Sequence, residues 1–155
     1  MVVPCSTPKG LAPGSEATLN ELRDETLRPQ HLSEPLPDAA IQFQSLEPFT
    51  LDKDVFATVL RQSRRGKSAG ISGNRNEYLR LCLEEDTPFN LLYDAAQQLA
   101  CADVPQDIVD ALALSKLTAL LKPNGRVRGV AAGDVFRRLV TKTLAKQMQE
   151  EFRDA

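Results

Sequence analysis

Apolar side chains recur every three or four positions in several segments after residue 49, which is the period of an α-helix. Thr50 is a possible N-cap of the first predicted helix, and Gly66 can end it. Asn74, with a glutamate three residues later, resembles a capping box for the second helix. Thr87, followed by a proline, opens the third, and Asp134 caps the last. The expected apolar stripes are Val55, Phe56, Val59 and Leu60; Tyr78, Leu79, Leu81 and Cys82; Leu91, Leu92, Ala95, Ala96 and Leu99; Ile108, Val109 and Leu112 after Pro105; and Val135, Phe136, Leu139, Val140, Thr143, Leu144 and Met148.

The pattern changes between residues 117 and 131. Two short runs, 117–121 and 126–130, flank Pro123-Asn124-Gly125, and an Asn-Gly turn between such runs predicts a β-hairpin. Because side chains alternate across a strand, Arg126 and Arg128 are expected to share a face, and Val127 to point the other way. The whole pattern predicts an α+β fold that is mainly α-helical, with a small antiparallel β-hairpin.

The first third of the chain differs in composition from the rest. Seven of the ten prolines fall within the first 48 residues, and no sustained apolar periodicity accompanies them. Ordering such a segment costs conformational entropy that little burial offsets. We therefore predict a disordered, proline-rich leader over residues 1–37, followed by one folded region over residues 38–155.

Charge is distributed unevenly along the chain, although the net charge of the 155 residues is only −2. Between Lys116 and Lys146, eight basic residues accompany a single acidic residue, Asp134, which gives this stretch a net charge of +7. A local excess of this size indicates a polyanion or a phosphate group as the partner of the C-terminal third.

The cysteine and histidine content gives no metal-ligand motif. Cys5, Cys82 and Cys101 lie far apart, and His31 is the only histidine. A reducing intracellular compartment, nucleus or cytoplasm, is the expectation. No apolar run reaches the length of a membrane span, and the N-terminus does not resemble a secretory signal, so neither membrane insertion nor secretion is predicted.

Residues 64–73 read RRGKSAGISG, and Gly66-Lys67-Ser68 matches the end of a phosphate-binding P-loop. A P-loop requires another glycine five residues before Gly66, where this chain has Arg61, and a strand before the loop. The preceding segment has a helical pattern instead. A nucleotide-binding P-loop is therefore not predicted.

Three segments together resemble the fingers region of a reverse transcriptase, an RNA-directed DNA polymerase, most closely that of non-LTR (LINE-like) retrotransposons. Residues 65–73, RGKSAGISG, are similar to the glycine-containing segment of this family of transposable elements. Residues 117–131, LTALLKPNGRVRGVA, are similar to its Lys-Pro-x-Gly and Arg-Pro-Ile block, and residues 136–142 to the helix that follows. The likeness covers about residues 50–155, and region 38–155 is expected to be a fingers subdomain truncated before the palm. The sequence departs from the family at Gly129, where proline is commoner, and at Ser72, where aspartate is usual.

The resemblance implies a role for each basic segment. Arg128 occupies the position of the family's motif arginine and is expected to contact the incoming nucleotide triphosphate, with Arg126 and Lys122 assisting. The guanidinium group is suited to this task because it makes bidentate contacts with phosphate. Lys67, Arg65 and Arg138 are expected to contact the template or another nucleic acid. The partners implied are therefore RNA or DNA and a deoxynucleoside triphosphate, in the context of a full-length polymerase.

The resemblance also implies catalytic carboxylates, which this sequence lacks. The family holds its two metal ions with palm aspartates, and no matching aspartate motif occurs before residue 155. Neither a catalytic nor a metal-binding residue is predicted here, and Mg²⁺ is expected only with a complete palm. We expect a nucleotidyltransferase fragment that is inactive alone, either a truncated reading frame or a piece of a polyprotein. The inner face of its last helix would then be left exposed, because no palm sheet covers it.

Two other interpretations remain open. The basic stretch would also suit a noncatalytic nucleic-acid-binding module, and the helices would suit a protein-interaction domain whose arginines are only solvated surface. On that view Arg126 and Arg128 form the wet face of a hairpin, and Lys67 is an ordinary loop lysine. The aromatic residues on apolar stripes are expected to lie in the core under every interpretation: Tyr78, Phe89, Tyr93 and Phe136.

Overall fold

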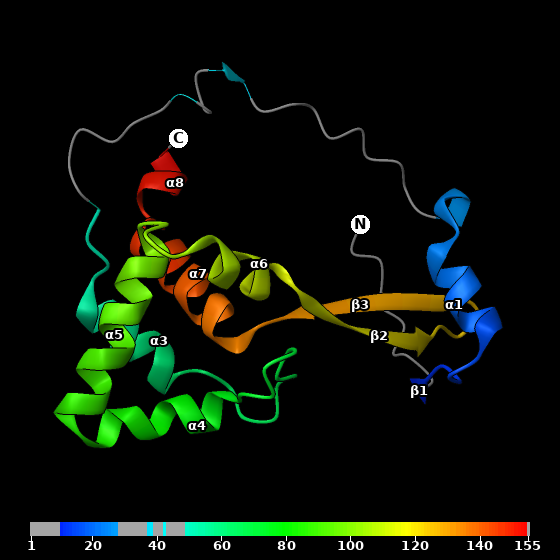
Figure 1. The fold of residues 1–155 in the computed structure, drawn as a ribbon, viewed down its shortest axis with the longest axis horizontal. Coiled ribbons are helices and arrows are strands. Elements are labelled where there is room, and N and C mark those ends of the chain that lie inside the picture. The colour runs from blue at the N-terminus through cyan, green and yellow to red at the C-terminus, as the bar shows by residue number, and fades with distance from the viewer. Residues whose placement is uncertain (1–9, 28–36, 39–41, 43–48, 155) are drawn as a thin grey trace. The chain divides into compact units, whose positions relative to one another are not determined.

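The computed structural model describes residues 10–27, 37–38, 42 and 49–154 (Figure 1). About 54% of the described structure is helical, and it contains one small three-stranded antiparallel sheet, so the predicted α+β, mainly helical class is confirmed. The elements in chain order are β1 (Gly10–Leu11), α1 (Glu16–Arg23), η1 (Glu25–Leu27), α3 (Lys53–Arg61), α4 (Asn76–Leu81), η2 (Cys82–Glu84), α5 (Asp86–Ala100), α6 (Gln106–Ala113), β2 (Ser115–Leu121), β3 (Val127–Gly133), α7 (Val135–Gln147) and α8 (Glu151–Asp154).

The chain divides into two compact units. The first contains the described residues of Met1–Gln44 together with Leu117–Ala131, which form the outer part of the hairpin. The second contains Ser45–Lys116 and Ala132–Ala155, and it holds the helices from α3 onward. None of the helices in the described part of the chain is long and apolar enough to cross a membrane.

The core of the second unit is formed where α3 and α5 pack against α7 (Figure 1). Phe56 of α3 is fully buried, and its ring lies 6.0 Å from that of Tyr93 and 6.2 Å from that of Phe89. The apolar spacing that predicted the helices therefore identifies most of this core. Its buried members are Leu51, Phe56, Val59, Leu60, Ala96, Leu139 and Val140.

The extended segment before α3 is held by two glutamine side chains. The Gln97 amide accepts a hydrogen bond from Leu51 N at 2.7 Å and donates one to Phe49 O at 2.8 Å. Gln147 of α7 likewise accepts a hydrogen bond from Asp52 N and donates one to Thr50 O. These side chains satisfy backbone groups that belong to no helix or sheet, and thereby fix where α3 begins.

Several predicted details of the helices are wrong. Asp52, not Thr50, caps α3, because its carboxylate accepts the hydrogen bond from Val55 N at 2.8 Å. Tyr78 and Leu91 are exposed at 56% and 66%, although both were expected on buried stripes. The inner face of α7, which was expected to be exposed, is covered because α3 and α5 pack against it. Its buried residues are Val135, Leu139, Val140 and Thr143.

The described part of the expected leader is regular structure. Residues 10–27 form β1, α1 and η1, while the rest of the first 36 residues lies outside the described residues. Pro13 lies between β1 and α1, no proline falls within α1 itself, and Ser15 caps this helix by accepting a hydrogen bond from Thr18 N. β1 pairs with β2 through Gly10↔Leu121 and Leu11↔Leu120. The proline content of the segment predicted disorder, whereas the structure has the helix α1 there.

Candidate functional site

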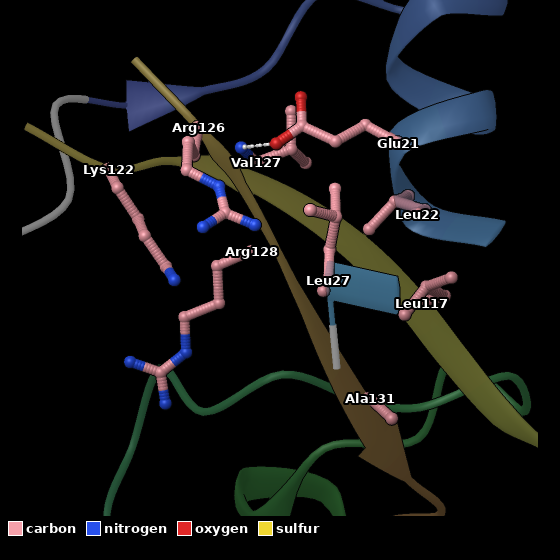
Figure 2. A pocket seen from close by; sticks show the side chains of 10 residues that line it. Glu21, Leu22, Leu27, Leu117, Lys122, Arg126, Val127, Arg128 and Ala131 are labelled. Atoms are coloured by element: carbon pink, nitrogen blue, oxygen red, sulfur yellow. Dashed lines mark hydrogen bonds between the residues drawn. The ribbon is translucent and has the colours of Figure 1, made fainter. Parts of the chain in front are cut away.

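The hairpin gathers three basic side chains at one pocket of the first unit. Lys122, Arg126 and Arg128 line a pocket of about 460 Å³, together with Glu21, Leu22 and Leu27 from α1 and η1. Figure 2 shows the three basic side chains pointing to the same side of β3, with Leu22 and Leu117 on the other. These are the residues that the sequence predicted as a group.

The turn of the hairpin sets this grouping. Gly125 N donates a hydrogen bond to Lys122 O at 3.0 Å, and Lys122 N donates one to Arg126 O at 2.8 Å. Gly125 has a φ of +79°, so Pro123-Asn124-Gly125 forms a three-residue loop that ends in a left-handed residue. The hairpin is confirmed, with a longer turn than the two-residue Asn-Gly type. Lys122 and Arg126 are thereby fixed on opposite sides of the turn with their backbones paired.

Glu21 is the acidic residue of this pocket that sequence analysis missed. Its Oε1 accepts a hydrogen bond from Val127 N at 2.7 Å, which occupies the first backbone donor of β3 (Figure 2). The residues are 106 positions apart in the chain, so no local motif could have connected them. The carboxylate is therefore engaged by the backbone at the pocket that the three basic side chains also line. Outside the pocket lining, Asp24 has its pKa lowered by hydrogen bonds from Thr26 and, to a smaller extent, by Arg126.

Gly129 gives α1 room to pack on the hairpin. A Cβ at this position would lie 3.2 Å from Leu22 Cδ2 and 3.2 Å from Leu117 Cδ1. These contacts are tighter than ordinary van der Waals packing, and a proline ring would extend further. A larger residue at this position would require the Leu22 and Leu117 side chains to move.

The other predicted basic residues lie in the second unit, and they do not form one group. Lys67 and Arg138 line a pocket of about 430 Å³ with Arg64 and Lys142. Arg65 instead lines a different pocket, beside Arg61, Glu77, Arg80 and Glu84. Arg65 and Lys67 therefore line different pockets although they are close in sequence, because the chain turns between them at Gly66, which has a φ of +71°.

The glycine-containing loop is pinned at several points. The Glu77 carboxylate accepts a hydrogen bond from Gly66 N at 2.7 Å, which lowers the pKa of Glu77, and Arg75 and Arg65 lower it further. Gly70 is buried with a φ of +75°, and an added Cβ would lie 2.8 Å from Gly133 O. The loop thus packs against the start of α7. Because Gly66 N is already bonded, it does not act as a P-loop donor, and the segment before it is the helix α3.

The described residues include no group of three or more His, Cys, Asp or Glu side chains placed to hold a metal ion. The two-metal chemistry that the resemblance implies therefore has no ligand set in this part of the chain. The pocket chemistry is instead that of fixed cations, which suits binding of phosphate oxygens.

No protein-family model, curated protein or solved structure matches this chain. The resemblance to reverse-transcriptase fingers stays a prediction.

Proposed function

We propose that this chain is a fragment of an RNA-directed DNA polymerase, similar to those of non-LTR retrotransposons, and that its hairpin binds the triphosphate of an incoming nucleotide. The observation that supports this most directly is the convergence of Lys122, Arg126 and Arg128 on one pocket. Arg128 makes the principal contact, and the other two bind the remaining phosphate oxygens. Lys67 and Arg138 supply template contacts, while Arg65 lies at a separate pocket and is not needed for them.

The chemistry of the hairpin pocket fits a triphosphate better than a neutral ligand. A nucleoside triphosphate carries a charge of about −4, and each charge-assisted hydrogen bond contributes roughly 1.5–3 kcal/mol. Guanidinium groups remain charged at any physiological pH, so the pocket stays cationic. Glu21 does not cancel this charge completely, because three cations and one carboxylate line the pocket, and that carboxylate is bonded to Val127 N.

The test is a titration of the 155-residue chain with a deoxynucleoside triphosphate, in which the NMR chemical shifts of residues 122–131 report binding. Arg128→Ala is expected to weaken binding by about tenfold or more, which corresponds to about 1.4 kcal/mol or more. Arg23→Ala is the matched control, because Arg23 is an exposed arginine of α1 that does not line the pocket. Equal affinities of the Arg128 variant and the unaltered chain would refute the proposed nucleotide contact.

A noncatalytic nucleic-acid-binding module is the second candidate, and the separate basic pocket of the second unit favours it. This alternative predicts that Arg128→Ala weakens RNA and nucleotide binding to the same modest extent. Sequencing the transcript beyond codon 155 also separates the two. An in-frame hydrophobic-Asp strand followed by an Asp-Asp hairpin would support the polymerase, and its absence from the mature transcript would support the module.

A further inference from the structure

The second unit contains a pocket in which every charged side chain that the structure describes is basic. Arg64 and Lys67 come from the loop after α3, and Arg138 and Lys142 come from α7. The pocket has a volume of about 430 Å³, and the rest of its lining is uncharged. The polar members are Gln62, Ser63 and Asn76, and the apolar members are Val59 of α3 and Val135 and Leu139 of α7. Four positive charges therefore meet at one concave surface.

This arrangement is unfavourable unless an anion is bound. Arg138 and Lys142 are four residues apart on one helix, and like charges at that spacing destabilise a helix slightly. Adding Arg64 and Lys67 to the same pocket increases the repulsion. A bound anion would convert each of these repulsions into an attraction.

Arg138 provides an independent indication of a missing partner. Its Nη2 donates a hydrogen bond to Ser68 O, which fixes the guanidinium at the loop. Its Nε is buried and has no hydrogen-bond partner among the described residues. A buried donor without a partner is unfavourable, more so when the group is charged. The bond to Ser68 O thus already positions the planar guanidinium at the pocket.

The backbone that carries the other cations is also fixed. Asn76 Nδ2 donates a hydrogen bond to Arg64 O at 2.8 Å, and Ser63 Oγ donates one to Leu60 O at 2.7 Å. Gly70 lies against Gly133 and Asp134, so the far end of the loop is anchored as well. The pocket is therefore built before any ligand arrives, which reduces the ordering cost of binding.

We propose that this pocket binds a phosphate group, and that Arg64 and Lys142 complete a four-cation site with Lys67 and Arg138. The phosphate is a phosphodiester of a single nucleic-acid strand. The inference deepens the template contact of the proposed function and rests on it for the source of the phosphate. The same chemistry would bind a free oligophosphate, so the experiment uses both probes.

The experiment measures binding of the full 155-residue chain to a labelled single-stranded RNA dodecamer and to inorganic tripolyphosphate. Lys142→Ala and Lys67→Ala are the test variants, since both lysines are exposed and their removal does not disturb the core. Lys146→Ala is the matched control, an exposed lysine one turn further along α7 that lies outside the pocket. Each test variant is expected to weaken RNA binding three- to tenfold at low salt. Each should also reduce the slope of log K against log salt by about 0.7, the value for one phosphate contact on a single strand.

The outcomes separate this proposal from the nucleotide contact. Weaker RNA binding by the pocket variants, with the Lys146 variant unchanged, supports the site even if Arg128→Ala leaves nucleotide affinity intact. If the pocket variants bind tripolyphosphate more weakly but RNA unchanged, a nucleic-acid strand is not the source of the bound phosphate. Unchanged binding of both probes, or an equal loss in Lys146→Ala, overturns the site.

Discussion

Gly70 occupies a position in the fold where a side chain would not fit. Its φ of +75° is costly for an L-residue, and a Cβ would approach Gly133 O at 2.8 Å and Asp134 Cα at 2.9 Å. Both neighbours are backbone atoms, which cannot rotate away. We expect Gly70→Ala to lower the free energy of unfolding by about 2–4 kcal/mol, measured by urea denaturation.

Gly73 offers a matched comparison for this prediction. It has nearly the same φ, +76°, but nothing lies within 4 Å of its added Cβ. Gly73→Ala should therefore lower the free energy of unfolding only by the cost of the left-handed backbone conformation, about 1–2 kcal/mol. If the two variants proved equally stable, the close packing of the loop against the start of α7 would be contradicted.

Single residues were predictable where local chemistry decides their role. Asp134 was recognised as a cap, and its Oδ1 accepts a hydrogen bond from Phe136 N at 2.8 Å. Arg126 and Arg128 could be grouped because side chains alternate along a strand, whereas Lys122 was added to them only through the resemblance. Glu21 could not be found in the same way, because only the folded chain brings it to Val127. Sequence pattern thus located the cations of the pocket and missed its carboxylate.

At the scale of elements, the start of α4 ties down the glycine-containing loop. The expected capping box is wrong, because Asn74 N donates to Ser72 Oγ, Arg75 is the cap residue without a side-chain hydrogen bond, and Glu77 accepts a hydrogen bond from Gly66 N. This bond lowers the pKa of Glu77 in the folded state. A lowered pKa means that the tie is fully present above the ordinary glutamate pKa and is lost as the pH falls through the lowered one.

We therefore expect the Gly66 amide to become less protected from hydrogen exchange as the pH is lowered through this range. Exchange rates must first be corrected for the intrinsic pH dependence. Glu77→Gln keeps an acceptor oxygen but removes the titration, so its Gly66 protection should vary little with pH. Glu84→Gln, which changes an exposed carboxylate of η2, should behave like the unaltered chain. An acid-induced loss that persists in Glu77→Gln would assign the effect to another group.

Helix existence followed from sequence more reliably than helix boundaries. The spacing of apolar residues predicted α3, α5 and α7 because their buried faces repeat with the helical period. The start of α3 depends on Asp52 and on the distant amides of Gln97 and Gln147, which no local pattern reveals. α1 was overlooked because the prolines around it dominated the composition of the segment.

At the scale of the whole molecule, the fold class was predictable and the covering of the last helix was not. The resemblance to a polymerase fragment led to the expectation of an exposed inner face on α7. Instead, Leu139 and Val140 are only 4% and 3% exposed, and they belong to the same core as Phe56. The second unit thus provides its own cover for this helix. The apolar stripe of α7 is therefore buried within the unit itself.

This core should make the second unit cooperatively stable in the isolated chain. Phe56 is fully buried and contacts two aromatic rings, so Phe56→Ala removes a large side chain and leaves a cavity. Such substitutions cost about 3–5 kcal/mol. Leu91→Ala is the matched control, because Leu91 is 66% exposed on α5 and its truncation should change stability by about 0.5 kcal/mol or less. Far-UV circular dichroism during urea denaturation measures both. Equal midpoints for the two variants would mean that α7 is not held by this core in solution, and the exposed face expected from the resemblance would then be correct.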